Sequence, residues 1–294
     1  MEITILSRSC SAVIDTRGAE LKSFRDVTGD EYMWQADPAY WAKTSPVLFP
    51  NVGVLSGNKA NIGGKDYPLR RHGFARDIEF KVMYQERDRA VFCLSSNEQT
   101  LQEYPFPFML RLTYHITDCA VEIQYDVMNT GEQTMFYKIG AHPAFRCPVT
   151  EGDRFENYQI VFPEPETAGC PVMDLETQRF SSENRVPFLK NERKFRLDYH
   201  FFDRDALIFD QLKSRSVSLE SILTGRGVQL DFEGFDTLGV WSPAQKEAPF
   251  VCLEPWAGCA VDYPEEDGTF ERMHGIQQVE PTEMKRYRVK ISLL

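Results

Sequence analysis

Two histidines and one glutamate lie in unusually constrained local sequences. His72 follows two arginines and precedes a glycine, His142 lies between Gly-Ala and Pro, and Glu254 lies between Leu and Pro-Trp. The chain of 294 residues has only five histidines, and two of them occupy such settings. Imidazole exchanges protons near neutral pH without large tuning, and a carboxylate can perform the opposite half of the same transfer. These residues predict acid–base chemistry.

His142 follows the apolar segment that ends at Ile139. Gly140 and Ala141 keep bulk away, and a residue before proline is restricted to extended backbone angles. The imidazole is therefore expected to leave a strand end in a fixed direction. The alternative is a buried structural histidine that is hydrogen-bonded to a backbone carbonyl.

His72 stands in a basic turn, after Arg70 and Arg71 and before Gly73, with Arg76 four residues further on. Neighbouring arginines bias an imidazole toward its neutral form, which favours a hydrogen-bonding role over an acid role. Glycine allows positive φ angles and the close approach of a ligand. Arg71 and Arg76 are better candidates than Arg70 for ligand contact. The alternative is a solvated basic turn.

Glu254 lies in an apolar stretch, where a carboxylate is not expected without a partner or a function. Partial burial would raise its pKa toward the working pH of a general base. The alternative is a structural salt bridge with an arginine. Trp256, two residues on, could stack on the apolar face of a sugar ring, whereas the other tryptophans are expected in the core: Trp34, Trp41 and Trp241.

Apolar and polar residues alternate with a period of two through most of the chain. Segments 108–116 and 120–127 predict a hairpin, and 217–222 with 228–232 a second one. Short buried strands are expected at 238–241 and 250–253, and a terminal strand at 287–293. Helical signals are confined to a short capped turn at 39–42, after Asp37-Pro38, and to 204–212. The pattern predicts an all-β protein, a large antiparallel β-sandwich with few short helices, formed by one domain over residues 1–294.

Composition excludes several classes of partner. The formal net charge of −11, from 44 acidic and 33 basic residues, argues against nucleic acid and anionic membranes as partners. Seven scattered cysteines without a Cys-x-x-Cys pair are typical of reduced thiols, and no leader or long apolar run is evident, so a cytoplasmic protein is expected. No P-loop, Gly-x-Gly-x-x-Gly, His-Glu-x-x-His or Gly-x-Ser-x-Gly motif occurs, and no cofactor or metal is implied.

Segments along nearly the whole chain resemble the aldose 1-epimerase (galactose mutarotase) family, and in particular its LacX-like branch. Their order and spacing carry the resemblance more than any single segment does. The segments are 18–21 (Gly-Ala-Glu-Leu), 46–50 (Pro-Val-Leu-Phe-Pro), 51–53 (Asn-Val-Gly), 72–76 (His-Gly-Phe-Ala-Arg), 140–145 (Gly-Ala-His-Pro-Ala-Phe), 238–242 (Leu-Gly-Val-Trp-Ser) and 252–258 (Cys-Leu-Glu-Pro-Trp-Ala-Gly).

The resemblance implies a β-sandwich with an open sugar cleft on a concave sheet. His142 would be the general acid and Glu254 the general base, and His72 would bind the ring-oxygen side of the sugar with help from Arg71. Where the galactose enzymes of the family have an asparagine near the first histidine, this chain has Arg71, which weakens the expectation of galactose as substrate.

The family also uses an aspartate to hold sugar hydroxyls. Asp205 and Asp203 both lie in the corresponding stretch, and Asp205 is favoured. The resemblance thus implies an isomerase that interconverts the α and β anomers of an aldohexose by ring opening and reclosure. A shared cleft is expected to favour a charged His142 beside an ionised Glu254.

Two alternatives stay open. Arg71 and Arg76 could form the charged fork that a hexose phosphate needs, which would make the protein a sugar-phosphate mutarotase. A sugar-binding or regulatory protein could instead keep the cleft without the activity.

Overall fold

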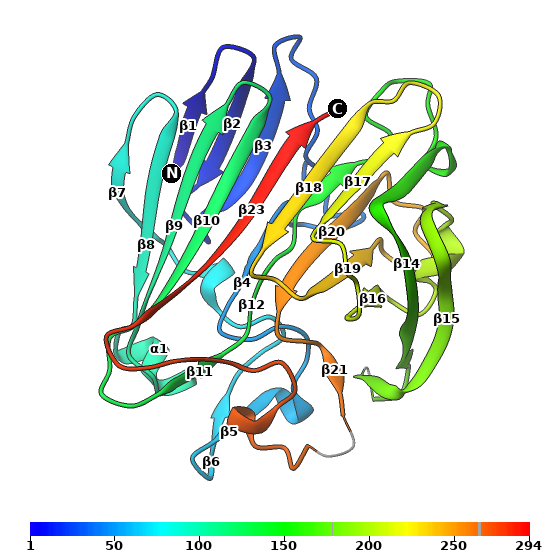
Figure 1. Ribbon diagram of the computed structural model, residues 1–294. Coiled ribbons are helices and arrows are strands. Elements are labelled where there is room, and N and C mark those ends of the chain that lie inside the picture. Colours follow the sequence, from blue (N-terminus) through cyan, green and yellow to red (C-terminus); the bar gives the residue numbers. More distant parts are fainter. Residues whose placement is uncertain (178, 264–265) are drawn as a thin grey trace.

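Strands dominate the computed structural model, which describes residues 1–177, 179–263 and 266–294 (Figure 1). Within these residues the helical segments are one short α-helix, α1 (Glu98–Glu103), and five single turns of 3₁₀-helix. The turns are η1 (Ser56–Asn58), η2 (Ala75–Asp77), η3 (Phe155–Asn157), η4 (Tyr199–Phe202) and η5 (Phe270–Arg272). The predicted all-β class with few short helices is confirmed.

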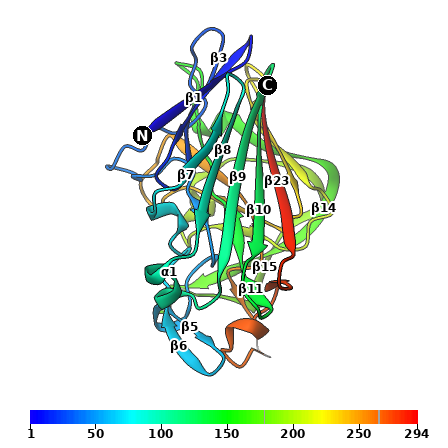
Figure 2. The same cartoon turned by 90° about the vertical axis from the view of Figure 1, so that its left-hand side faces the viewer.

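The largest sheet has ten strands in the described part of the chain, and it combines strands from both halves of the sequence. Across the sheet the order is β21 (Val261–Asp262), β15 (Arg179–Arg196), β14 (Tyr158–Asp174), β17 (Ser216–Ser221), β18 (Gly227–Glu233), β23 (Met284–Leu293), β10 (Ala120–Asn129), β9 (Phe108–Thr117), β8 (Arg89–Ser95) and β7 (Lys81–Gln85). Figure 2 shows β7, β8, β9, β10 and β23 side by side. The pairs are antiparallel except for β15 with β21.

Alternating side chains explain the hairpin of β9 and β10. Leu110 and Leu112 on β9, and Val121 and Ile123 on β10, point into the core, while their polar neighbours are partly exposed. The register pairs Val121 with Ile116. Because one face is buried, a slip by one residue would expose the whole apolar set, so the pattern determines the register.

A second sheet of six strands covers the inner face of the large one (Figure 1), counted over the residues that the structure describes. It consists of β16 (Leu207–Phe209), β19 (Thr237–Trp241), β20 (Phe250–Ala257), β12 (Ile139–Ala141) and β4 (Val47–Leu48), with β13 (Ala144–Arg146) also paired to β20. The main hydrophobic core lies between the two sheets and contains apolar side chains from both. This arrangement confirms the predicted β-sandwich.

Smaller sheets flank the sandwich. They are formed by β1 (Glu2–Leu6), β2 (Cys10–Asp15) and β3 (Glu20–Asp26), by β11 (Met135–Tyr137) with β22 (Gln277–Val279), and by β5 (Lys59–Ile62) with β6 (Lys65–Pro68). The prediction of one domain stays a prediction.

The helical prediction at 204–212 is wrong, whereas the short capped turn predicted at 39–42 corresponds to a turn whose first residues are capped by the Asp37 carboxylate, which accepts from the Ala39 N–H at 2.9 Å. Residues 207–209, within the predicted helix at 204–212, form β16, whose three residues are all buried and pair with β19. A continuous apolar run carries no period, so it does not distinguish a buried strand from a helix. Residues 38–40 form a hydrogen-bonded turn, closed by the Trp41 N–H, which donates to the Asp37 carbonyl at 2.9 Å.

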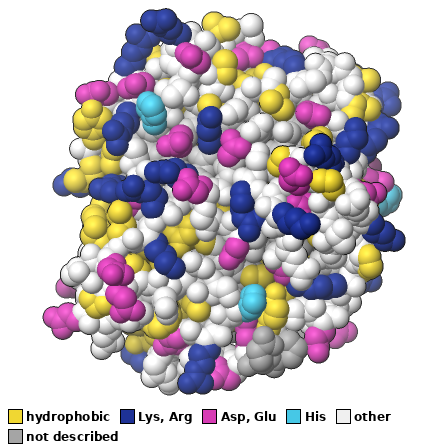
Figure 3. Space-filling view, viewed as in Figure 1, with side chains coloured by type: hydrophobic (Ala, Val, Ile, Leu, Met, Phe, Trp, Pro, Cys, Tyr) yellow, Lys and Arg dark blue, Asp and Glu magenta, His cyan; other side chains and the backbone are white. Residues whose placement is uncertain are grey.

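Basic and acidic side chains are interspersed over the face shown in Figure 3. Ion pairs such as Arg111–Asp126 and Arg286–Asp126, both at 2.7 Å, join neighbouring strands of the large sheet. Among the described residues, no helix is long and apolar enough to cross a membrane.

Candidate active site

Strand β20 places Glu254 on the face of the six-stranded sheet that points away from the main core. Alternate residues of a strand face opposite sides, and Val251, Leu253 and Ala257 belong to the main core. Glu254 therefore shares the other face with Cys252 and Trp256. All eight residues of this strand are buried, which explains why its sequence is apolar apart from one carboxylate.

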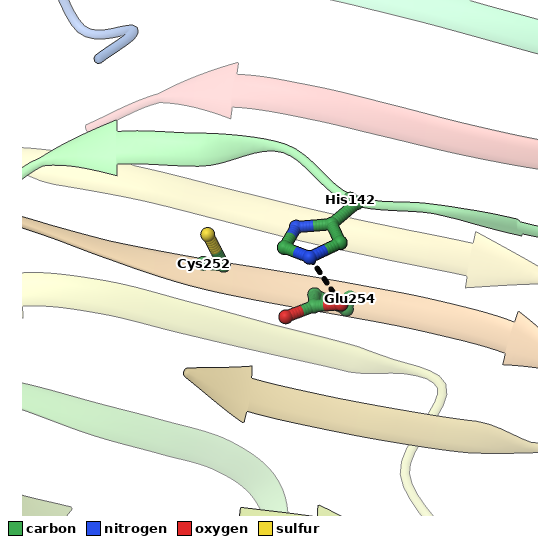
Figure 4. A group of neighbouring side chains, drawn as sticks. All are labelled: His142, Cys252 and Glu254. Atoms are coloured by element: carbon green, nitrogen blue, oxygen red, sulfur yellow. Dashed lines mark ion pairs between the residues drawn. The ribbon is translucent and has the colours of Figure 1, made fainter. Parts of the chain in front are cut away.

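The register of the sheet brings His142 opposite Glu254. Strands β12 and β13 both pair with β20, with Gly140 opposite Trp256 and Ala144 opposite Cys252. His142 lies between these two pairs, at the point where Pro143 interrupts the ladder. Its Nε2 lies 3.1 Å from Glu254 Oε2, and the two side chains are only 8% and 3% exposed. Figure 4 shows the imidazole reaching across to the carboxyl group.

Burial sets the charge state of this pair. It lowers the pKa of His142 to about 3, with further lowering by the charges of Arg76 and Arg71. It also raises the pKa of Glu254 well above its usual range, and the charge of Asp205 adds to this. The ligand-free pair therefore favours a neutral imidazole beside a protonated carboxyl, which corrects the charged state predicted from the sequence. A single proton transfer across the hydrogen bond converts one state into the other.

His72 is held as a neutral ring. Its backbone N–H donates to the Gly53 carbonyl at 3.0 Å, and the Gly53 N–H donates to its Nδ1 at 3.2 Å. Because Nδ1 accepts, the ring proton resides on Nε2. Burial, the nearby His142 and the two arginines lower the pKa of His72 well below its usual value, in that order of importance. The predicted neutral form is confirmed, although burial contributes more than the arginines do.

The turn that carries His72 depends on glycine. His72 and Gly73 have φ angles of 64° and 69°, in the left-handed region that favours glycine. Gly73 packs so tightly that a Cβ atom there would collide with the Phe49 carbonyl. The close approach of these two segments brings the imidazole of His72 beside that of His142, with 5.6 Å between the ring centroids.

All seven residues proposed from the sequence as catalytic or substrate-binding line one cavity of about 280 Å³: Arg71, His72, Arg76, His142, Asp205, Glu254 and Trp256. This volume lies just below the usual range for small-molecule sites, which suits a small ligand. Trp41, Val54, Met173, Arg179, Phe180 and Trp241 are among the other lining residues.

Asp205, and not Asp203, faces the cavity. Asp205 has a φ angle of 80°, and burial raises its pKa, an effect that the nearby Arg71 partly offsets. Asp203 is exposed, and its carboxylate lies 3.1 Å from the Nδ1 atom of His200. The preference for Asp205 therefore agrees with its position.

The arginines differ in how they are held. Arg76 donates from Nη2 to the carbonyl of Arg71 at 2.9 Å, which ties Arg76 into the local framework. Arg70 pairs with Asp77 and Glu103 instead of lining the cavity. Among the described residues Arg71 forms no ion pair, so its guanidinium is available to a ligand.

Trp256 contributes to the cavity wall but is only 3% exposed. It packs against two glycines: a Cβ atom at Gly140 would lie 2.6 Å from its Cδ1, and one at Gly239 would lie 2.8 Å from its Cζ2. Both glycines are therefore needed for close packing. Stacking of Trp256 on a sugar ring stays a prediction.

Sequence reasoning missed the wall formed by the far ends of β14 and β15. Met173, Arg179 and Phe180 line the cavity from there. Arg179 forms an ion pair with Asp262, in which Nη2 donates to Oδ1 at 2.7 Å and Nε lies 2.6 Å from Oδ2. Their position depends on the parallel pairing of β15 with β21, which no local pattern indicates. Trp41 and Trp241, assigned to the core from the sequence, also line the cavity.

Cys252 lies beside the acid–base pair (Figure 4), and its thiol, His142 and Glu254 each offer a potential metal-ligand atom within 4.8 Å of the others. A cysteine binds metal as the thiolate, whereas burial raises the pKa of this thiol well above its usual value. His142 and Glu254 already direct their polar atoms at each other. We therefore describe the group as an acid–base pair with a neighbouring protonated thiol.

The model of the aldose 1-epimerase family matches residues 1–264. The chain is 37% identical over 300 residues to the chromosomal protein LacX of Lactococcus lactis subsp. lactis, with full coverage of both chains.

Solved structures share the fold over the whole chain, among them two from lactobacilli. One is a galactose mutarotase related enzyme from Lactobacillus acidophilus, with a TM-score of 0.93, 30% identity, and coverage of 100% of this chain and 97% of that one. The other is a galactose mutarotase-like protein from Lactobacillus casei, with a TM-score of 0.91, 27% identity and full coverage of both chains.

Proposed function

The chain belongs to the aldose 1-epimerase family, and we propose that it interconverts the α and β anomers of an aldohexose. The observation that carries this proposal is the hydrogen-bonded pair of His142 and Glu254, 3.1 Å apart in a buried cavity. A pair that shares one dissociable proton can donate at one end while it accepts at the other, which is what opening a cyclic hemiacetal requires.

The reaction begins when Glu254 takes the proton of the C1 hydroxyl and His142 donates its proton to the ring oxygen. The bond between C1 and the ring oxygen breaks, and C1 becomes the carbonyl carbon of the open aldehyde. Rotation about C1–C2 presents the other carbonyl face. The ring hydroxyl then attacks C1, returning its proton to His142 while Glu254 reprotonates the new C1 oxygen.

Surrounding groups support the binding half of the proposal. The Nε2–H of His72 and the guanidinium of Arg71 are donors for the ring-oxygen side of the sugar, and Asp205 is an acceptor for hydroxyl groups. Water is largely excluded from the buried pair, so a low local dielectric strengthens each of these hydrogen bonds.

The neutral state of the ligand-free pair means that a proton must move before Glu254 can act as a base. Burial favours the neutral pair, and the base is active only after the proton has moved from Glu254 to His142. Hydrogen bonds from sugar hydroxyls to the Glu254 carboxylate would lower its pKa. Bound sugar thus promotes the catalytic form of the pair.

A hexose phosphate is the second candidate, and Arg71 favours it because this guanidinium has no ion-pair partner among the described residues. Arg76 supports it less, since Arg76 is bonded to the Arg71 carbonyl and lies 3.9 Å from Asp77. Free sugar is therefore the leading substrate. A binding protein without activity does not require a buried acid–base pair, so we rank that alternative last.

Anomer exchange measured by NMR tests the proposal. Freshly dissolved α-glucose, α-galactose and glucose 6-phosphate serve as substrates, with His142→Asn as the control protein. We expect acceleration that is lost in the control, and the best substrate decides between free and phosphorylated sugar. Binding of these sugars without exchange would overturn the mutarotase proposal in favour of a binding protein.

A further inference from the structure

The indole ring of Trp41 stacks on the imidazole of His142. Their centroids lie 4.8 Å apart with an angle of 24° between the planes. Two further rings meet the same imidazole at steep angles, Trp241 at 5.8 Å and 87° and His72 at 5.6 Å and 81°. The acid of the proposed pair is therefore enclosed by aromatic rings, and Trp41 is the ring that presents its face.

Trp41 is held rigidly although it comes from a turn. Its N–H donates to the Asp37 carbonyl and its own carbonyl accepts from Trp34 Nε1, both at 2.9 Å. Lys246 Nζ donates to the carbonyls of the two preceding residues at 3.1 Å each. The ring also stacks on Phe250, with 5.9 Å between centroids and 24° between planes. These contacts fix the indole before any ligand arrives.

The surroundings of His142 otherwise oppose its charge. Arg71 and His72 approach it from the turn before η2 and Arg76 from η2 itself, and both arginines disfavour a second positive charge nearby. Cys252 on β20 is a protonated thiol, so a negative charge near His142 has to come from Glu254 or from Asp205, which follows η4 and lines the same cavity. Burial raises the pKa of both carboxyl groups and so disfavours that charge. A buried acid in such a site needs a further source of stabilisation when it holds its proton.

An aromatic face supplies that stabilisation. The π system of tryptophan is negative above the ring, and it attracts a cation within about 6 Å of the centroid, most strongly where water is excluded. We propose that Trp41 is a positioning residue that stabilises the protonated form of His142 through its ring face, so that the acid is available when the sugar ring opens. The effect of Trp41 on catalysis rests on the proposed function. Its effect on the charge of His142 does not depend on that function.

Fluorinated tryptophans test the proposal without changing burial. Site-specific incorporation of mono-, di- and trifluorotryptophan at position 41 withdraws electrons from the ring face while nearly preserving its shape. The matched control is the same series at Trp34, which belongs to the same buried aromatic cluster but does not line the cavity. Ring ¹⁵N shifts, which distinguish a charged imidazole from its neutral tautomers, report the state of His142, assigned with the His142→Asn protein.

Because the pKa of His142 is lowered to about 3, the shifts are followed through an acid titration, and we expect each added fluorine at position 41 to lower the pH at which His142 becomes charged. Trifluorotryptophan at position 41 should lower kcat by about tenfold relative to the parent, equivalent to one pKa unit, with little change in KM. The series at position 34 should do neither. An unchanged titration midpoint of His142 across the position 41 series would overturn the proposal, as would equal shifts of that midpoint in the position 34 series. If no sugar is turned over, the ¹⁵N series still decides the question, so failure of the proposed function and failure of this inference are distinguishable.

Discussion

Two buried carboxyl groups, one on each sheet of the sandwich, have pKa values shifted in opposite directions. Asp126 on β10 of the large sheet is 1% exposed and accepts hydrogen bonds from Arg286, Arg111 and Gln124. Burial raises its pKa, but these bonds outweigh burial, so the pKa lies below its usual value. Glu254 on β20 is 2% exposed, has His142 as its ion-pair partner, and has a pKa well above its usual value.

The contrast separates a structural charge from a carboxyl group of the proposed catalytic pair. Asp126 is fully compensated, so its charge is permanent and joins neighbouring strands. Glu254 lacks that compensation, so burial dominates and raises its pKa, as is common for titratable groups at functional sites. Near-complete burial is common to both carboxylates, and the number of donors around each one decides its role.

The largest expected effect is on activity. Glu254→Gln should lower the rate of anomer exchange by about 10²–10⁴-fold, because the proton acceptor is lost, while sugar binding is retained. Asp126→Asn, the matched change on the other sheet, should leave the rate close to that of the parent. NMR exchange and calorimetric sugar binding measure the two quantities. A parental rate in Glu254→Gln would show that this carboxylate is not the base.

The pH profile of kcat/KM should reflect the same pair. Activity requires one dissociable proton shared by His142 and Glu254. A second proton is gained near pH 3, where His142 becomes charged, and the shared proton is lost as pH rises through the raised pKa of Glu254. The value of kcat/KM should therefore stay constant across acidic pH above about 3. It should fall about tenfold per pH unit once the pH exceeds the raised pKa of Glu254. A profile that only rises through the usual carboxyl range would contradict the raised pKa.

For the free energy of unfolding, the larger effect is expected at Asp126 and the smaller one at Glu254. Asp126→Ala removes the carboxylate that compensates Arg111 and Arg286, and we expect a loss of about 1.5–3 kcal/mol in the free energy of unfolding, typical of hydrogen bonds to charged groups. Urea unfolding at neutral pH measures it, with Gln124→Ala as a milder control. No loss would mean that solvent compensates both arginines equally well.

The smallest effect concerns the stability of Glu254→Gln. The folded-state pKa of Glu254 lies above the ordinary 4.5, so its contribution to stability is complete below pH 4.5 and is lost as pH rises through the folded pKa. Glutamine does not titrate and can donate to His142. The variant should therefore gain stability relative to the parent between pH 4.5 and 8, and the gain should grow with pH. Equal differences in urea unfolding at both ends of this range would contradict the prediction.

The sequence by itself determined the local features of this protein. Period-two alternation identified the hairpins, such as β9 with β10, because the side-chain pattern of a half-buried strand is written in consecutive residues. The settings of His72, His142 and Glu254 marked the site for a similar reason: glycine and proline act on the backbone where they stand. The segments resembling the aldose 1-epimerase family then indicated how the three residues work together.

Only the tertiary structure decided what depends on partners distant in the sequence. The register of β12 and β13 on β20 placed His142 opposite Glu254, and the parallel pairing of β15 with β21 brought Arg179 to the cavity. The helix expected at 204–212 gave way to β16, because pairing with β19 overrides an ambiguous apolar run. The charge state of the pair was reversed as well, since the cost of burying a charge is set by the atoms that the whole fold packs around it.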